Sequence, residues 1–143
     1  MSATLDVNVL IYASNSADPA HQAARELVER LGGGPDLLYL FWPTLMGYLR
    51  IATHPGILPR PLEPRVAIAN LSDLVALPHV RSPGEVEGFW ELFRATAGHT
   101  RRGDDVPDAH LATLMRQHGV RVIYTRDRGF RRFEGIDVRD PFA

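Results

Sequence analysis

The chain contains neither cysteine nor lysine. The absence of cysteine excludes disulfides, thiolate zinc sites and thiol nucleophiles. All 16 basic residues are therefore arginines, which excludes Schiff-base chemistry and a phosphate-loop lysine but permits bidentate contacts to phosphate. The longest apolar run, over 37–42, is far shorter than the ~20 residues of a membrane-spanning helix. With no basic leader before Ala3, these features predict a cytoplasmic protein without a membrane partner.

The 143 residues, 45% hydrophobic and 23% charged, predict one globular domain over 1–143. The net charge of −1 excludes general disorder, but it conceals an uneven distribution of charge. The segment 94–132 holds nine arginines and four acids, whereas 1–93 holds six arginines and ten acids. A basic segment of this kind is typical of a polyanion-binding surface or of a solvated arginine-rich face, and charge alone does not separate the two.

The apolar pattern alternates short strands with amphipathic helices. Asn8 is positioned to cap a helix that begins at Val9, directly after the first strand. Strands separated by helices predict a mostly parallel central sheet in a three-layer α/β/α fold, whose sites lie beyond the carboxyl ends of the strands. The predicted strands cover 3–5, 37–42, 120–124 and an edge strand at 136–138, with extended chain at 78–81. The predicted helices cover 9–12, 21–31, 43–53, 65–75, 84–97 and 108–118, with a loop over 100–106.

Three acids fall at junctions between these elements. Asp6 ends the first strand, Asp108 begins a helix and Asp127 follows the strand over 120–124. Gathered at one sheet edge, the three carboxylates would repel one another unless a cation such as Mg²⁺ or Mn²⁺ compensated them. A metal so placed activates water for attack on a phosphodiester. Read singly, Asp108 is also typical of a helix first turn and Asp127 of a turn.

Arginines surround the third acid, and these could hold neighbouring phosphates. We expect contacts to RNA from the arginines of this basic region, with specificity from unpaired bases. The candidates are Arg101, Arg102, Arg126, Arg128, Arg131 and Arg132.

Four blocks in register resemble the PIN-domain proteins, in particular the VapC-type toxins of bacterial toxin–antitoxin pairs. They are LDVNVLIYA at 5–13, PTLMGYLRIATHP at 43–55, VPDAHLA at 106–112 and IYTRD at 123–127, and RDPF at 139–142 resembles the closing strand. The resemblance implies a PIN fold, a Mg²⁺- or Mn²⁺-dependent endoribonuclease, a VapB-type antitoxin partner and a homodimer. It places Asp6, Asp108 and Asp127 at the metal-site positions. It places Asn8 and Thr125 where side chains orient those acids or a bound water.

The chain departs from the family pattern at two positions. Leu45 aligns where a glutamate is usual, and Gly129 stands where relatives often carry a second aspartate. Asp104, four residues before Asp108, is a candidate substitute, since both would share a face if the intervening loop is helical. Solvated loop acids explain Asp104 equally well. We therefore expect a three-acid core with altered metal affinity.

Two functions follow from this pattern. The first is an RNA-cleaving toxin, and the second is a catalytically degenerate PIN domain that binds RNA or an antitoxin without cutting. A third, an aspartate-based phosphatase or receiver-like domain, is disfavoured because no lysine is available. The apolar helices over 20–31 and 44–53 suit a groove for an antitoxin helix, although core packing explains them as well. There Arg50, if buried, needs an acidic partner from this chain or from the antitoxin.

Overall fold

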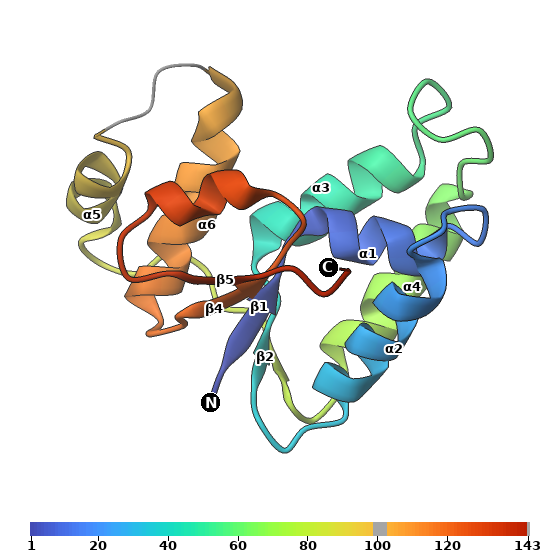
Figure 1. The fold of residues 1–143 in the computed structure, drawn as a ribbon, viewed down its shortest axis with the longest axis horizontal. Coiled ribbons are helices and arrows are strands. Elements are labelled where there is room, and N and C mark those ends of the chain that lie inside the picture. The colour runs from blue at the N-terminus through green and yellow to red at the C-terminus, as the bar shows by residue number, and fades with distance from the viewer. Residues whose placement is uncertain (99–102, 143) are drawn as a thin grey trace.

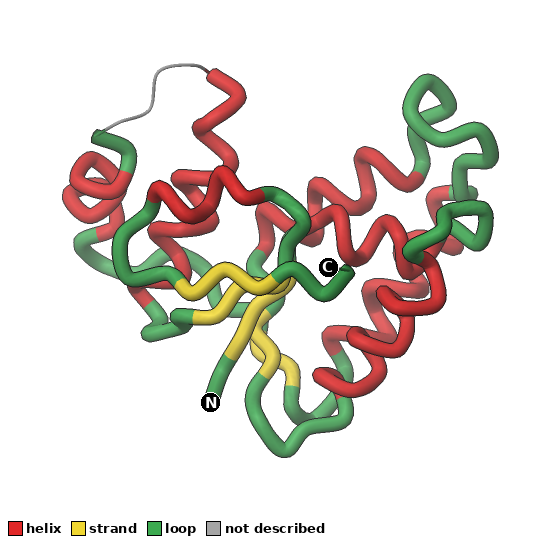
Figure 2. Tube along the Cα trace, viewed as in Figure 1, coloured by secondary structure: helices red, strands yellow, loops and turns green. Residues whose placement is uncertain are grey.

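A five-stranded parallel sheet forms the centre of the molecule (Figures 1 and 2). The computed structural model describes residues 1–98 and 103–142, apart from the side chain of Asp104. The strands lie in the order β3-β2-β1-β4-β5, and every neighbouring pair is parallel. Their bounds are β1 Ala3–Leu5, β2 Leu38–Tyr39, β3 Val80–Arg81, β4 Val122–Tyr124 and β5 Asp137–Arg139.

Helices cover both faces of the sheet, which confirms the predicted three-layer α/β/α architecture. One layer holds α1 to α4, and the other holds α5, α6 and a 3-10 helix, η2 (Figure 1). Within the described residues, no helix is long and apolar enough to cross a membrane. The bounds are α1 Val7–Ser14, α2 His21–Gly32, α3 Trp42–Ala52, α4 Pro64–Val75, α5 Phe89–Thr96, η1 Gly103–Asp105, α6 Val106–Gln117 and η2 Arg128–Arg132.

The core consists of two apolar clusters, one on each side of the sheet. The first joins Leu5 and Leu38 to α1 to α4, and the second joins Phe41 and Ile123 to α5, α6 and η2. The three residues of β1 are all buried because helices cover both of its faces, as is usual for a parallel sheet. The central strand is therefore buried up to Leu5, and the first charged residue of the chain, Asp6, follows it directly.

Two of the predicted elements that are shorter in the structure have a clear physical reason. The predicted strand over 37–42 keeps strand pairing only at Leu38–Tyr39, and Trp42 instead opens α3 with a 46% exposed side chain. Pro43 accounts for the early start, because proline favours the first turn of a helix. The predicted helix over 84–97 shrinks to α5, because Gly88 adopts a left-handed φ of 85° that a helix does not permit. Trp90 of α5 is 61% exposed.

Candidate metal centre

The sheet reverses its winding between β1 and β4, and the candidate site lies at that switch point. From β1 the chain first adds β2 and β3 on one side, then returns to add β4 and β5 on the other. Open parallel sheets bind ligands at such a point, beyond the carboxyl ends of the strands. Asp6 follows β1 directly, and its backbone N–H donates to the Tyr124 carbonyl at 3.0 Å. Thr125 and Asp127 follow β4, and Asp108 is the third residue of α6.

Asp6 is held by hydrogen bonds on both carboxylate oxygens. Its Oδ1 accepts from the Val7 backbone N–H at 2.7 Å, so Asp6 caps α1. Its Oδ2 accepts from the Thr125 hydroxyl at 2.7 Å and, more weakly, from Asn8 Nδ2 at 3.4 Å. The prediction that Asn8 caps a helix starting at Val9 is therefore wrong, because the helix starts two residues earlier and Asp6 takes that role. Asn8 instead lies in the first turn, against Asp6.

The buried hydroxyl of Thr125 links three of the predicted site residues. It donates to Asp6, and it accepts from the backbone N–H of Asp127 at 2.9 Å and from Asn8 Nδ2 at 3.3 Å. Because one hydroxyl has one proton and two lone pairs, these contacts use its whole capacity. Thr125 therefore fixes the orientation of Asp6 relative to the chain leaving β4.

Asp127 and Asp108 complete the acidic cluster. Asp127 Oδ1 accepts from the Gly129 N–H at 2.8 Å and caps η2. Asp127 therefore also has the structural role in a turn that its sequence position allowed. Burial raises the pKa of Asp6 above its ordinary value. Burial also raises the pKa of Asp108 to about 6, against a hydrogen bond from Arg132 that lowers it, and the charges of Asp127 and Asp6 raise it further. The three acids are thus close enough to repel one another.

The shifted pKa of Asp108 predicts an unusual pH dependence of stability in the metal-free protein. Its pKa is about 6 in the folded chain and 3.8 ordinarily, so the folded state binds the extra proton between these values. The contribution of Asp108 to stability should therefore rise as the pH falls from 7 through 6, and level off near 4. Urea unfolding in chelator should show Asp108→Asn more stable than the parent at pH 7, with the gap narrowing as the pH falls and closing near pH 4. A gap independent of pH would contradict the prediction.

The donor set fits a hard divalent cation that retains several waters. Within the described residues, no three acidic or histidine side chains converge closely enough to enclose an ion by themselves. However, Mg²⁺ is usually bound by one or two carboxylates and completes its shell with water. The mutual repulsion of the acids favours a cation among them. In addition, the buried Oδ1 of Asn8 has no hydrogen-bond partner in the described part of the chain, which leaves an oxygen available beside Asp6.

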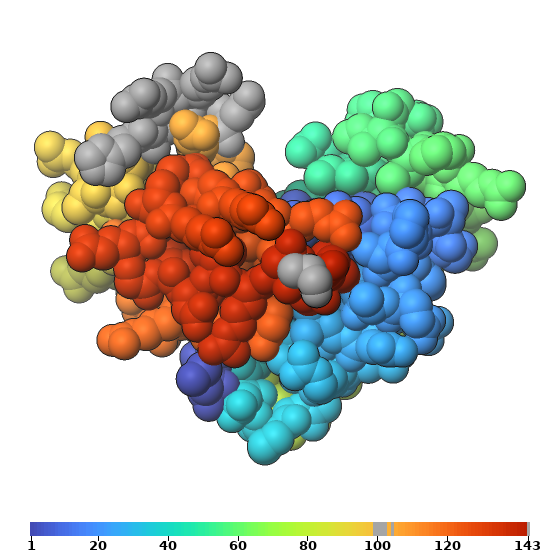
Figure 3. Space-filling view, viewed as in Figure 1, coloured from blue at the N-terminus to red at the C-terminus, as the bar shows by residue number. Residues whose placement is uncertain are grey.

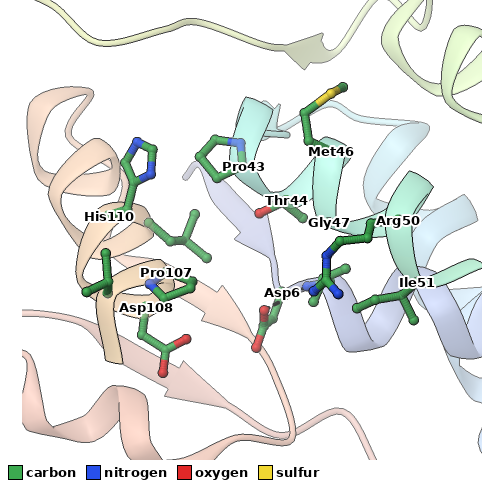
Figure 4. Close-up of a pocket in the computed structure, with 13 residues that line it drawn as sticks. Asp6, Pro43, Thr44, Met46, Gly47, Arg50, Ile51, Pro107, Asp108 and His110 are labelled. Atoms are coloured by element: carbon green, nitrogen blue, oxygen red, sulfur yellow. Dashed lines mark hydrogen bonds between the residues drawn. The ribbon is translucent and has the colours of Figure 1, made fainter. Parts of the chain in front are cut away.

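A pocket of about 420 Å³ opens onto Asp6 and Asp108 (Figure 4). Thr44, Gly47 and Arg50 of α3 form one wall, and the start of α6 forms the other. In the space-filling view the molecule is notched at the top, between the orange and the green segments (Figure 3). His110, to which the sequence assigned no role, lines the α6 side and pairs with Glu85 at 2.7 Å.

The structure resolves two points about α3. Leu45, aligned with the family's glutamate, is completely buried in the first core cluster and does not line the pocket. Gly47 is the α3 residue that lines the pocket near Asp6. A Cβ added at Gly47 would come no closer than 3.5 Å to its nearest neighbour, Val7 Cγ2. Arg50, which would have needed an acidic partner if buried, is exposed at the pocket and makes no ion pair with the described residues.

The arginines that the sequence offered as RNA contacts lie in different environments. Arg101 and Arg102 lie outside the described residues. Arg126 packs against the rings of Tyr12 and Phe142, with its guanidinium carbon 5.0 and 4.7 Å from their centroids. The other three arginines belong to η2: Arg128 and Arg131 are exposed, whereas Arg132 reaches the acidic cluster. Asp104 lies in η1, which leads directly into α6, and its side chain lies outside the described part.

Residues 3–136 match the PIN domain family. The chain belongs to the PIN-domain family. It is 51% identical to Ribonuclease VapC48 of Mycobacterium tuberculosis, over all of this chain and 99% of that protein. Two solved structures share this PIN fold. VapC20 of Mycobacterium tuberculosis, a Sarcin-Ricin loop cleaving toxin, is 18% identical, with a TM-score of 0.68 over 94% of this chain and 98% of that one. VapBC2 from Rickettsia felis, bound to a promoter DNA fragment, is 12% identical, with a TM-score of 0.68 over 97% and 98%.

Proposed function

We propose that this PIN domain is the toxin of a type II toxin–antitoxin pair and acts as a metal-dependent endoribonuclease. The observation that carries the proposal is the pocket at the switch point, with Asp6 and Asp108 facing each other across it, in a chain half identical to a VapC ribonuclease. The whole chain, 1–143, is the proposed functional unit, and the cytoplasm, where RNA is available, is its proposed location.

The proposed mechanism assigns distinct tasks to the residues of the pocket. Asp6, Asp108 and Asp127 would hold Mg²⁺ or Mn²⁺, with Asp104 as a further candidate ligand. When bound, such an ion supplies a Lewis acid that acidifies water and offsets the charge of a phosphodiester. Thr125 holds the Asp6 carboxylate in one orientation through its 2.7 Å hydrogen bond, and Asn8 supports the same oxygen. These contacts prevent the acid from rotating away from the pocket.

Arginines are the proposed RNA contacts. Arg50 projects into the pocket from α3 without an ion-pair partner among the described residues, so its guanidinium is available to a phosphate there. The arginines of the 94–132 segment would bind the flanking backbone, with Arg101, Arg102, Arg126, Arg128 and Arg131 as candidates.

The proposed partner is a small VapB-type antitoxin. This proposal is supported by a solved structure of the same fold, a toxin–antitoxin complex from Klebsiella pneumoniae, which is 18% identical with a TM-score of 0.62 over 98% of each chain. An acidic side chain of the antitoxin would find in Arg50 a cation that this chain leaves without an ion pair in its described part. Occupying the pocket would then exclude RNA. We also propose that the toxin forms a homodimer.

A degenerate PIN domain that binds RNA or an antitoxin without cleavage is the second candidate. It is favoured by the absence of any acid on the pocket wall formed by α3, where Thr44, Gly47 and Arg50 stand. One carboxylate fewer weakens the attraction for a cation. Tight RNA binding without metal-dependent cleavage would identify this function.

The proposal is tested by incubating purified, antitoxin-free protein with total cellular RNA in Mn²⁺, Mg²⁺ or chelator. We expect discrete cuts with either metal and none in chelator, because the acids alone supply no Lewis acid. The Asp6→Asn/Asp108→Asn double variant, purified identically, should be inactive and excludes a contaminating nuclease. Cuts that persist in the double variant or in chelator would contradict the proposal. Binding to the same RNA pool with no cut under any condition would select the degenerate domain.

A further inference from the structure

Arg132 lies across the acidic cluster that the proposed function assigns to a metal. Its Nη2 is 3.2 Å from Asp108 Oδ2 and 3.7 Å from Asp105 Oδ1, so one guanidinium nitrogen bridges two carboxylates at the start of α6. This contact spans 24 residues of sequence. Among the described residues, Arg132 is the only basic side chain in an ion pair with Asp6, Asp108 or Asp127.

Contacts on three sides hold the Arg132 guanidinium in this position. Its Nη1 donates to the Gly129 carbonyl at 2.6 Å, and its carbon lies 4.5 Å from the centre of the Phe133 ring. The side chain is consequently only 32% exposed, although it belongs to a surface helix. The guanidinium fits in this position only because residue 129 is a glycine: a Cβ there would stand 2.8 Å from Arg132 Nη1. A larger residue would push the guanidinium away.

We propose that Arg132 is the resident counter-cation of Asp108, which a divalent ion must displace in order to bind. The inference rests on the proposed function, since it requires that a metal binds at Asp108. In the metal-free protein the guanidinium offsets the repulsion among the carboxylates, and an arriving ion competes with it for Asp108 Oδ2. Asp105 lies within reach of the same nitrogen, so the displaced guanidinium keeps a carboxylate partner. Arg132 is thus a positioning residue that sets the metal affinity.

The test is calorimetric titration of Mn²⁺ into metal-free protein, without RNA. Arg132→Gln should bind Mn²⁺ about five- to tenfold more tightly than the parent, because the competing cation is gone while the carboxylates remain. Arg131→Gln is the matched control: it removes the same charge from the adjacent, exposed position, and its affinity should stay within about twofold of the parent. Arg132→Lys keeps the charge but loses the planar guanidinium that hydrogen-bonds to both Gly129 and Asp108. Its Mn²⁺ affinity should therefore rise about threefold.

A second readout is thermal stability, measured with and without the metal. In chelator, Arg132→Gln should have a lower melting temperature than Arg131→Gln, and saturating Mn²⁺ should remove this difference. Equal or weaker Mn²⁺ binding by Arg132→Gln would overturn the inference, and if that variant does not fold, unchanged binding by Arg132→Lys would do so. A parent that shows no Mn²⁺ binding, or binding that Asp108→Asn leaves intact, overturns the metal site of the proposed function as well. The two failures are therefore distinguishable.

Discussion

A glutamate at Leu45 is expected to unfold the protein, whereas a glutamate at Gly47, on the same helix, should leave it folded. Leu45 is 0% exposed in the core, so Leu45→Glu removes its apolar burial and places a carboxylate among aliphatic side chains. We expect a loss of about 5 kcal/mol or more, comparable with the whole stability of a small domain. Circular dichroism and thermal unfolding of both variants measure the difference.

Gly47→Glu should also strengthen the metal site. A Cβ at Gly47 meets nothing closer than 3.5 Å, and its replacement raises helix propensity by roughly 0.5 kcal/mol. The new carboxylate would enter the pocket beside Asp6, and we expect Mn²⁺ affinity to rise about tenfold. Gly47→Gln is the matched control, because it adds the same bulk without charge. A folded Leu45→Glu variant, or equal Mn²⁺ affinity for the Glu and Gln variants at Gly47, would show that this face of α3 is wrongly assigned.

Asp6→Asn is expected to reduce RNA cleavage by about a thousandfold while leaving the fold intact. Asparagine caps a helix as well as aspartate does, so the bond to the Val7 N–H should survive. The variant loses the charge that would hold the metal. A bound metal lowers the reaction barrier by several kcal/mol, and losing that much corresponds to about a thousandfold in rate. Single-turnover cleavage of a defined RNA target at saturating Mn²⁺ measures the effect.

The same variant should keep a stability close to that of the parent in chelator. Burial raises the pKa of Asp6, so the neutral amide avoids the cost of burying an ionised carboxyl. However, its Nδ2 cannot accept the hydrogen bond that Asp6 Oδ2 takes from the Thr125 hydroxyl, and the two effects oppose each other. Asp6→Ala, in contrast, should lose about 1 kcal/mol with the cap. Asp73→Asn, at an exposed position on α4, is the control for both assays. An Asp6→Asn enzyme as active as Asp73→Asn would exclude Asp6 from the reaction.

Local patterns in the sequence were enough to predict the layers and the place of the site. The apolar run up to Leu5 and the one up to Tyr124 predicted two buried strands, and parallel strands end at one edge of a sheet. The sequence alone therefore predicted that Asp6 and Asp127 lie at the same sheet edge. Gly119, with φ 68°, ends α6 where glycine was expected to close that helix. Where neighbours along the chain decide the conformation, the prediction was right.

Only the tertiary structure decided which side chains meet. Each residue turns a helix by about 100°, so an alignment can place Leu45 at the site while the fold turns Gly47 toward it and Leu45 into the core. No local signal showed that Arg132 pairs with Asp108 across 24 residues, or that Thr125 bonds Asp6 across 119. The sequence by itself determined the fold class, because burial patterns are local, and the role of the three acids stays a prediction. Their hydrogen bonds and counter-cation depend on packing between distant segments, which the tertiary structure alone supplies.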